Sequence, residues 1–392
     1  MKKSLYSAVS LLWNEKGGPS LNRIFEPFPV GSLVLRNRFV RSATYDGSAE
    51  RNGCVSAEQL RICSDLARGG VGLIITGITY VHHSGRISGF QNSLAEDHCI
   101  PSFKELTSAV HGFGAKIAAQ LFHAGIERAK FIKAKDQPAF SPSRIEDDLL
   151  DPNSYQVMTE DDIWTVIHAF GEAASRAKES GFDAVQIHAG HGYLLSQFLS
   201  PLTNRRTDIW GGSLQNRLRI HLEIYRQIVK ATGGNYPVMM KIGVQDGPPG
   251  GFSFEEGKQT CRLLAETGYA ALEISLGLRG KGYSNSEFRT QINTLDREAY
   301  FRPWCKEVRP EVKVPVMIVG GLRSFSLMEE IIQSGDADLI SLSRPLIREP
   351  QLINEWQRDP AYKARCVSCN KCFDALIKRE QFGCVQERMD LK

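Results

Sequence analysis

Three features are missing from this sequence of 392 residues. It has no apolar run of the roughly 18 residues that a membrane-spanning helix needs, so we expect no membrane span. It has no block of like charge, because 48 basic and 44 acidic residues are spread along the chain, which argues against nucleic-acid binding. No Gly-x-Gly-x-x-Gly motif follows a predicted strand, so the sequence shows no dedicated dinucleotide-binding domain.

The composition is that of an ordinary globular enzyme. Hydrophobic residues make up 42% of the chain and charged residues 23%, both close to the averages for globular proteins. We predict one catalytic domain at residues 21–358, an N-terminal extension at residues 1–20 and a cysteine-rich C-terminal tail at residues 359–392. The extension has two lysines and a modest apolar stretch but no small-residue cleavage site. We therefore predict a cytoplasmic protein, with an export or membrane-surface segment as the alternative.

Short β-branched runs alternate with helical patterns along the chain, which is typical of parallel strands covered by helices. Strands are predicted at residues 38–44, 72–80, 116–122, 184–188, 238–244, 271–275, 314–319 and 338–342. Helices are predicted at residues 57–68, 103–113, 161–180, 214–231, 255–267, 296–308 and 327–333. Eight strand units predict an α/β fold closed into a (β/α)₈ barrel, the TIM barrel, whose chemistry gathers at the carboxyl ends of the strands.

One segment, residues 183–217, holds the densest group of candidate catalytic side chains. Its apolar strand ends at His188, and His191 and Tyr193 follow closely. These N–H and O–H donors could hold a carbonyl oxygen and deliver a proton beside it. Two structural histidines and a packed tyrosine are one alternative. A metal-dependent hydrolase or lyase is another, although the histidines are three residues apart and Ala189 follows the first, unlike the helical zinc motif.

The segment resembles the old yellow enzymes, flavoprotein reductases that carry FMN in a (β/α)₈ barrel. Besides the His-x-x-His-Gly-Tyr core, the match includes Phe198, Leu199, Pro201, Asn204, Arg206, Asp208, Gly211, Gly212, Ser213, Asn216 and Arg217. The resemblance implies that NADH or NADPH docks transiently to reduce FMN. It further implies that hydride passes from flavin N5 to a C=C bond conjugated to a carbonyl. His188 and His191 would hold the carbonyl oxygen, and Tyr193 would supply the proton.

The same resemblance implies flavin contacts at the ends of several strands. These contacts are Ser42, Ala43, Thr44 and Tyr45 after the first strand, Ile78 on the second, Gln120 on the third and Lys241 on the fifth. Tyr45 stands where the family usually has threonine or cysteine, and a tyrosine without a catalytic part is the alternative. A buried amide or ammonium needs a polar partner, so Gln120 and Lys241 are notable without the resemblance. For Lys241 the alternative is a salt bridge inside the barrel.

A phosphate site is predicted after the seventh and eighth strands, where these barrels often bind phosphate. Gly320 and Gly321 end the seventh strand, and glycines let backbone N–H groups approach a phosphate closely. Ser326 and Glu329 then have the spacing of a capping box that opens a helix. The eighth strand is followed by Ser343 and Arg344, and arginine presents a fork suited to phosphate oxygens. Together these residues indicate a bound mononucleotide.

The tail concentrates four of the nine cysteines, Cys366, Cys369, Cys372 and Cys384. Gaps of two, two and eleven residues suit a four-thiolate metal site better than disulfides in a cytosolic chain. Larger two-domain relatives carry a [4Fe–4S] cluster at this place, with a second gap one residue longer. An iron–sulfur cluster, structural zinc or no metal are the three possibilities. We expect the other five cysteines to be scattered buried thiols.

A cluster would also suit a second function. In that alternative the enzyme is an FMN and iron–sulfur dehydrogenase that oxidises an amine or acyl thioester and passes electrons to a carrier protein. The main prediction remains an NAD(P)H-dependent reductase of a small unsaturated carbonyl compound, with a homo-oligomer possible. The pocket itself is expected to be set by the loops at residues 125–155 and 277–294.

Overall fold

The computed structural model describes residues 23–132, 138–145, 153–282, 286–378 and 380–390, and the predicted extension at residues 1–20 lies outside them. Its eight parallel barrel strands are β3 (Phe39–Arg41), β4 (Leu73–Tyr80), β6 (Lys116–Phe122), β9 (Ala184–Ala189), β10 (Val238–Gly243), β11 (Ala271–Ser275), β12 (Val316–Ile318) and β13 (Leu339–Leu342). Neighbours pair in this order, and β13 pairs with β3 to close the barrel. The short strand β5 (Asn92–Ser93) adds to β4. The predicted TIM barrel is confirmed.

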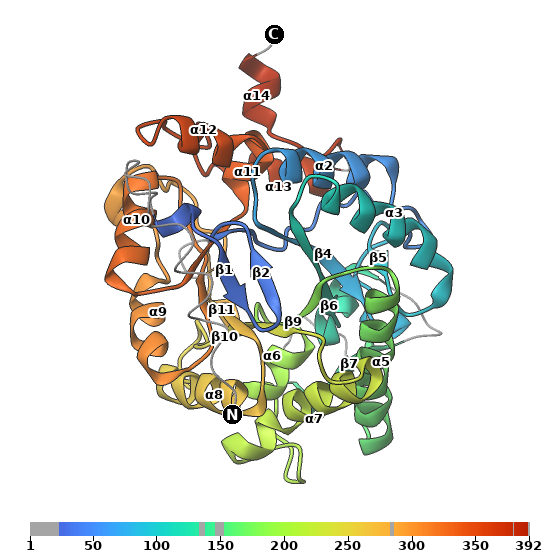
Figure 1. The fold of residues 1–392 in the computed structure, drawn as a ribbon. Helices are drawn as coiled ribbons and strands as arrows, with labels where there is room; N and C mark the ends of the chain where they lie inside the picture. The colour runs from blue at the N-terminus through green and yellow to red at the C-terminus, as the bar shows by residue number, and fades with distance from the viewer. Residues whose placement is uncertain (1–22, 133–137, 146–152, 283–285, 379, 391–392) are drawn as a thin grey trace, which may run out of the picture.

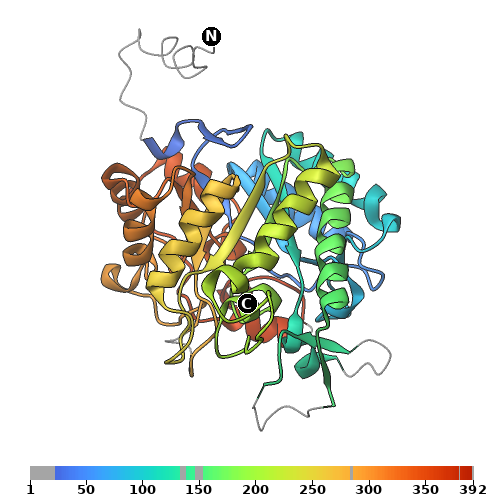
Figure 2. The same ribbon diagram turned by 90° about the horizontal axis from the view of Figure 1, so that it is seen from below.

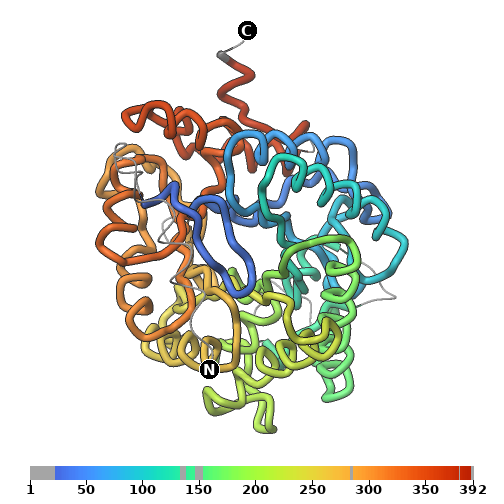
Figure 3. Tube along the Cα trace, in the orientation of Figure 1, coloured from blue at the N-terminus to red at the C-terminus, as the bar shows by residue number. Residues whose placement is uncertain are grey.

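Helices surround the strands in chain order (Figures 1 and 3). They are α2 (Ala57–Arg68), α3 (Ile100–His111), α5 (Glu160–Glu179), α7 (Leu214–Thr232), α8 (Phe254–Thr267), α9 (Arg302–Val308) and α10 (Phe325–Ser334), with shorter helices α4 (Arg128–Phe131) and α6 (Leu194–Leu199). Local sequence sets several of their starts. Thr159 and Asp162 form a capping box at α5, and Ser253 and Glu256 form one at α8. Apolar side chains between strands and helices form the main core.

An antiparallel hairpin plugs the amino-terminal end of the barrel. It consists of β1 (Phe28–Val30) and β2 (Leu33–Leu35), and it lies at the centre of the view in Figure 1. Val30 and Leu35 are fully buried against apolar side chains inside the barrel, among them Met239 and Met317. The strands β7 (Ala139–Ser141) and β8 (Tyr155–Val157) lie toward the opposite end (Figure 2). Because the hairpin closes the amino-terminal end, a site can form only at the carboxyl ends of the strands.

The C-terminal part follows the last barrel strand. It adds α11 (Arg344–Arg348), α12 (Leu352–Arg358), α13 (Lys371–Ile377) and α14 (Val385–Asp390). No helix in the part of the chain that the structure describes is long and apolar enough to cross a membrane.

Two helix predictions were wrong in detail. The helix predicted at residues 296–308 begins only at Arg302, because Ala299 has a left-handed backbone with φ of 51° that interrupts it. The capping box predicted from Ser326 and Glu329 does not form, since α10 begins at Phe325 and Ser324 is its N-cap. Glu298 accepts hydrogen bonds from the Ser324 N–H and hydroxyl, at 2.9 and 2.7 Å. A carboxylate from another segment therefore caps this helix.

The prediction of five scattered buried thiols was also wrong. Cys54 and Cys99 form a disulfide, although they are 45 residues apart in the sequence. The fold brings them together because the loop before α2 lies beside the start of α3. The other three, Cys63, Cys261 and Cys305, are free thiols that are partly or fully buried.

Candidate active site

His188, His191 and Tyr193 converge at the carboxyl end of β9. The His188 ring lies 4.8 Å from the His191 ring and 5.1 Å from the Tyr193 ring, measured between centroids. His191 and Gly192 have positive φ values of 60° and 77°, a conformation that is uncommon for a residue with a side chain. This turn brings three side chains that are close in sequence around one point. The structure thus assembles the predicted trio.

Both imidazoles are neutral. Burial, with Lys241 nearby, holds the pKa of His188 and of His191 well below the usual value. The Gly190 N–H donates to His188 Nδ1 at 3.3 Å, which leaves the proton of the neutral ring on Nε2. His191 Nε2 is hydrogen-bonded to the Ser275 hydroxyl at 2.8 Å. Its Nδ1 lies 3.7 Å from Glu287, beyond hydrogen-bond distance. In the tautomer whose Nε2 accepts from Ser275, the Nδ1–H is available to another acceptor.

Tyr193 lies between an aromatic ring and a cation. Its ring packs edge-on against Phe122 at 4.6 Å, and the Arg279 guanidinium lies 5.4 Å from the ring centroid. Burial raises the pKa of the Tyr193 hydroxyl, and the charge and hydrogen bond of Arg279 oppose that rise. Arg279 in turn is held by Glu287 at 2.5 Å. The phenol therefore keeps its proton at neutral pH, with a cation beside it.

The Arg279 and Glu287 pair was missed by the sequence analysis. Both residues lie in the loop at residues 277–294, which was expected to shape the pocket, but no residue in it was singled out. The available signal was weak, because charged residues are common in loops. The structure shows why the pair matters, because Arg279 lies over the Tyr193 ring and Glu287 lies beside His191.

A buried polar layer lies inside the barrel below this trio. Lys241 Nζ donates to Ser42 Oγ at 2.8 Å and lies 3.3 Å from Glu273 Oε1. Gln120 Nε2 donates to Gln186 at 2.7 Å, and Gln186 Nε2 donates to Glu273 at 2.9 Å. Since a buried charge needs compensation, Glu273 explains how Lys241 is tolerated. The salt bridge that was the alternative for Lys241 is therefore present. It does not exclude a contact between the same ammonium group and a flavin.

Glu273 and Gln186 were also missed, although a signal for them was available. Each is a polar residue in an otherwise apolar strand, β11 and β9 respectively. That was the observation that singled out Lys241 and Gln120. Applied to every strand, it would have found the whole layer.

The segment after β3 meets the ends of β13 and β4. The hydroxyls of Thr44 and Ser343 are hydrogen-bonded at 2.8 Å. Tyr45 donates to the Phe90 carbonyl at 3.2 Å and packs with Ile78 in a small apolar cluster that also includes Tyr193. Ala43 packs on the apolar interior of the barrel. Tyr45 thus lies at the same end of the barrel as the candidate trio His188, His191 and Tyr193.

The predicted phosphate residues also come together. Gly320 and Gly321 have φ values of +116° and +76°, and a Cβ at Gly320 would lie 2.6 Å from the Tyr300 ring. Arg289 lies over that ring at 4.5 Å, and its carbonyl accepts from Arg344 at 2.7 Å. The Arg289 Nε is buried and has no hydrogen-bond partner within the described residues. An unpaired buried cationic donor beside this turn fits an anionic group such as a phosphate.

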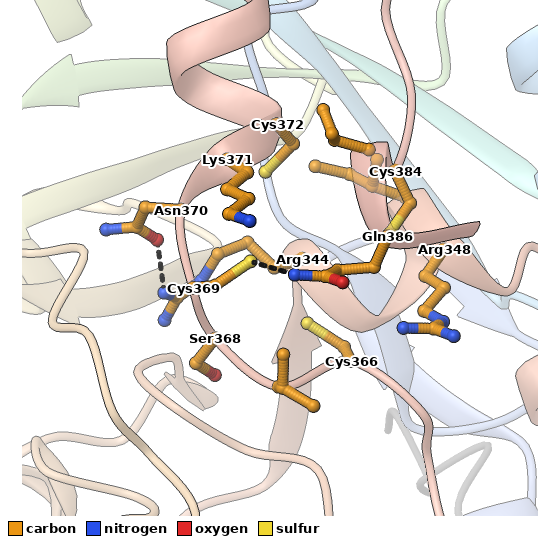
Figure 4. Close-up of a pocket in the computed structure, with 13 residues that line it drawn as sticks. Arg344, Arg348, Cys366, Ser368, Cys369, Asn370, Lys371, Cys372, Cys384 and Gln386 are labelled. Atoms are coloured by element: carbon orange, nitrogen blue, oxygen red, sulfur yellow. Dashed lines mark hydrogen bonds between the residues drawn. The ribbon is translucent and has the colours of Figure 1, made fainter. Parts of the chain in front are cut away.

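The four tail cysteines line one pocket with Arg344 and Arg348 (Figure 4). Ser368 and Asn370 have left-handed backbones, with φ of 52° and 59°, and they curl the loop between the thiols. Burial raises the pKa of the Cys366 and Cys372 thiols, and Arg344 opposes the rise in both. Thiols around one pocket beside a cation could serve as the ligands of an anionic metal cluster.

This tail docks on loops that belong to the barrel mouth. Asn370 accepts from Arg344 at 2.5 Å and donates to the Phe288 carbonyl at 2.7 Å. The Phe288 and Phe373 rings lie 5.4 Å apart. Leu376 packs on Gly47, just after Tyr45. The cysteine pocket therefore adjoins the end of the barrel that holds the candidate trio.

Comparison with known proteins identifies the family of this chain. Residues 23–360 match the NADH:flavin oxidoreductase / NADH oxidase family. The chain is 35% identical to an NADH oxidase of Thermoanaerobacter brockii over 88% of its own length, and 33% identical to an NADPH dehydrogenase of Halalkalibacterium halodurans over 87%. It covers 52% of the first protein and 94% of the second. The structure of an old yellow enzyme homologue from Zymomonas mobilis has the same fold, with a TM-score of 0.71 and 23% identity over 87% of this chain and 94% of that one.

The chain spans about half the length of the first curated relatives that it matches. The match to the family nevertheless runs through nearly the whole barrel, from the residues before β1 to those after α12. The chain therefore belongs to the NADH:flavin oxidoreductase / NADH oxidase family. This is the family of the old yellow enzymes, which residues 183–217 resemble.

Proposed function

We propose that this protein is an FMN-dependent, NAD(P)H-driven reductase of C=C bonds conjugated to a carbonyl. The observation that carries the proposal is the convergence of two neutral imidazoles and one protonated phenol at the carboxyl end of β9. Neutral N–H donors suit a carbonyl oxygen that gains negative charge during the reaction. A phenol beside them suits the transfer of one proton to carbon. The names of two relatives, NADH oxidase and NADPH dehydrogenase, support a nicotinamide donor.

In this proposal the His188 Nε2–H and the His191 Nδ1–H hold the substrate oxygen. They polarise the carbonyl and stabilise the negative charge that develops on its oxygen when the β-carbon accepts a hydride. FMN, when bound, supplies the hydride for the β-carbon. Tyr193 gives its proton to the α-carbon, while Arg279 stabilises the phenolate that is left behind.

FMN would be held along the barrel mouth. Lys241 and Gln120 would face the flavin ring, and the segment from Ser42 to Tyr45, with Ile78, would line it. Arg289, Arg344 and the Gly320–Gly321 turn would hold the phosphate. The buried Arg289 Nε without a partner among the described residues supports this arrangement.

The alternative functions are less well supported. A metal-dependent hydrolase would need His188 and His191 in a group that can share one ion. The described residues place neither of them in such a group of three. Among the described residues, only the tail cysteines suggest a dehydrogenase that feeds a carrier protein. A cytoplasmic location and a homo-oligomer stay predictions.

The direct test is a two-step titration of purified protein without oxygen. NADH or NADPH should bleach the flavin absorption, and an α,β-unsaturated ketone or aldehyde should restore it with one equivalent of saturated product. Protein purified without flavin, even after FMN is added, would contradict the proposal. So would a reduced flavin that unsaturated carbonyl compounds do not reoxidise.

Replacing His188 and His191 together with alanine should weaken the binding of phenol-like ligands by about 5- to 150-fold. Two hydrogen bonds at roughly 0.5–1.5 kcal/mol each are lost, and a substrate-like oxygen is left without donors. FMN should stay bound and reducible, because the pair faces the substrate oxygen in this proposal. The measurement is the charge-transfer absorption of a para-substituted phenol titrated into the holoprotein. Unchanged phenol affinity would remove the oxygen-holding role.

For the tail, we propose a [4Fe–4S] cluster on Cys366, Cys369, Cys372 and Cys384. Each thiolate of such a cluster binds its own iron atom, so the four sulfurs need not surround one point. This agrees with the described tail, where no three thiols are close enough to share a single ion. Structural zinc, whose four ligands lie at about 2.3 Å from one ion, fits the arrangement less well. An electron-carrier partner would follow from a cluster near the mouth.

Protein purified without oxygen should therefore contain about four irons per chain. The change Cys372→Ser should abolish the iron and leave the flavin content unchanged, because the flavin contacts come from the barrel. Cys261→Ser, a buried cysteine in α8, is the matched control and should keep the iron. Iron and zinc analysis of the three proteins makes the measurement. Stoichiometric zinc without iron would contradict the cluster and would show that the four cysteines bind a structural zinc ion.

A further inference from the structure

A second group of metal-ligand side chains lies away from the catalytic trio and the tail. Cys54, His98 and Cys99 form the one group of three, within the described residues, that could hold a single metal ion. Their ligand atoms all lie within 4.8 Å of one another. Zinc with thiolates at about 2.3 Å and imidazole at about 2.0 Å sets its ligands roughly 3.5 to 3.8 Å apart. Small side-chain shifts would therefore suffice.

His98 has a carboxylate beside one ring nitrogen, as metal-ligating histidines do, while its Nε2 donates to a carbonyl that a bound metal ion would replace. Its Nδ1 lies 3.3 Å from a Glu96 carboxylate oxygen, and its Nε2 lies 3.0 Å from the Asn52 carbonyl oxygen. That same carbonyl lies 3.8 Å from Cys99 Sγ, so Nε2 is on the side of the sulfurs. A histidine that binds a metal usually donates its other ring N–H to a carboxylate. Glu96 stands in that position.

The backbone holds the ligands from two directions. The Ser102 hydroxyl in α3 accepts from the Val55 N–H at 3.1 Å and donates to the Cys99 carbonyl at 2.9 Å. This bridge fixes the loop that carries Cys54 against the residue that precedes α3. Cys99 lies at the N-cap of that helix, where the positive end of the helix dipole favours a thiolate.

We propose that Cys54, His98 and Cys99 form a redox-gated site for Zn²⁺ or a similar soft divalent cation, closed by the disulfide and opened by its reduction. An external dithiol breaks the Cys54–Cys99 bond by giving two electrons and two protons, and it becomes a disulfide itself. Zn²⁺ then displaces the two thiol protons and binds the two sulfurs and His98 Nε2. Water takes the fourth position, as in other three-ligand zinc sites. The bonded and the metal-bound states exclude each other.

The test uses FMN-bound, full-length protein kept without oxygen. One sample is treated with a dithiol and desalted, and another is left oxidised. After reduction of the folded protein and removal of the dithiol, the thiols counted in denaturant should rise by two, because Cys99 is fully buried. In competition with a chromogenic zinc chelator, the reduced protein should bind about one more Zn²⁺ per chain than the oxidised protein. If the dithiol leaves the tail unchanged, the tail cysteines bind the same amount of zinc in both samples. The difference between the samples then reports only the site at Cys54, His98 and Cys99.

Variants separate this site from the tail. Reduced Cys54→Ser and His98→Ala proteins should each bind about one Zn²⁺ fewer than reduced wild type, while their tails are intact. Glu96→Gln should keep the stoichiometry but weaken zinc binding by about 10- to 100-fold. His168→Ala, which removes an exposed histidine on α5, should match wild type. His98→Ala keeps the disulfide, so it stays informative if Cys54→Ser folds poorly.

Equal zinc binding by reduced wild type, Cys54→Ser and His98→Ala would overturn the proposal. So would a thiol count that does not rise on reduction of the folded protein, because the pair would then be a permanent structural bond.

Discussion

The Tyr193→Phe protein should reduce unsaturated carbonyl substrates about 100- to 10,000-fold more slowly than wild type, the range that one general acid contributes. Phenylalanine keeps the ring that packs against Phe122 and under Arg279, so the pocket should keep its shape. Burial raises the pKa of the Tyr193 hydroxyl, so wild type should retain the proton through neutral and mildly alkaline pH. The measurement is the rate at which the reduced flavin is reoxidised by an enone in stopped flow.

The control for this prediction is the other half of the reaction. Flavin reduction by NADH or NADPH needs no proton from Tyr193, so its rate should change by less than about threefold. Binding of a phenol-like ligand should also persist, because the two histidines are unchanged. If both half-reactions slow equally, Tyr193 shapes the pocket and is not the proton donor. If neither slows, the proton comes from another group.

The second large effect is expected at the phosphate site. Replacing Arg344 with alanine should raise the FMN dissociation constant by about 10- to 150-fold, since a hydrogen bond to a charged group is worth roughly 1.5–3 kcal/mol. Arg289→Ala should have a similar effect, because its buried Nε has no other partner among the described residues. Molecules that still hold flavin should reduce enones at a rate close to that of wild type. Flavin fluorescence after dialysis, followed by titration with FMN, makes the measurement.

Arg262→Ala provides the matched control. Arg262 is a half-exposed arginine on α8 that pairs with Glu311 at 2.8 Å, and its loss should leave FMN binding unchanged. Arg344 also donates to Asn370 in the tail, so the iron content of Arg344→Ala should be measured with its flavin. Loss of iron with full retention of FMN would assign Arg344 to the tail. Full retention of FMN in Arg289→Ala as well would remove the phosphate site from this end of the barrel.

Arg344 joins the tail to the barrel mouth. Arg344 lines the cysteine pocket, and its guanidinium reaches the carbonyl of Arg289 in the loop after β11. A cluster in that pocket would therefore sit next to the residues proposed to hold the flavin phosphate. Electron transfer between a cluster and a flavin needs such closeness. The structure thus gives a physical reason to test both cofactors in the same variants.

The sequence by itself determined the barrel and placed the three candidate side chains at the end of one strand. Parallel strands are buried on both faces, so they appear as continuous apolar runs that can be found without knowing their neighbours. The strands predicted at residues 116–122 and 271–275 match β6 and β11 residue for residue. His188, His191 and Tyr193 lie within six residues at the end of β9, so a single turn suffices to bring them together.

Only the tertiary structure decided which distant residues became partners. Ser42 donates to Glu273, 231 residues away, and Cys54 is bonded to Cys99 across 45 residues. Arg279, paired with Glu287, lies over the Tyr193 ring. Glu298 caps α10, where a capping box from Ser326 had been predicted. Loop residues follow no period, and a contact between separate segments depends on how the whole barrel closes. Local pattern therefore locates the carboxyl ends of the strands, whereas closure of the barrel decides what meets there.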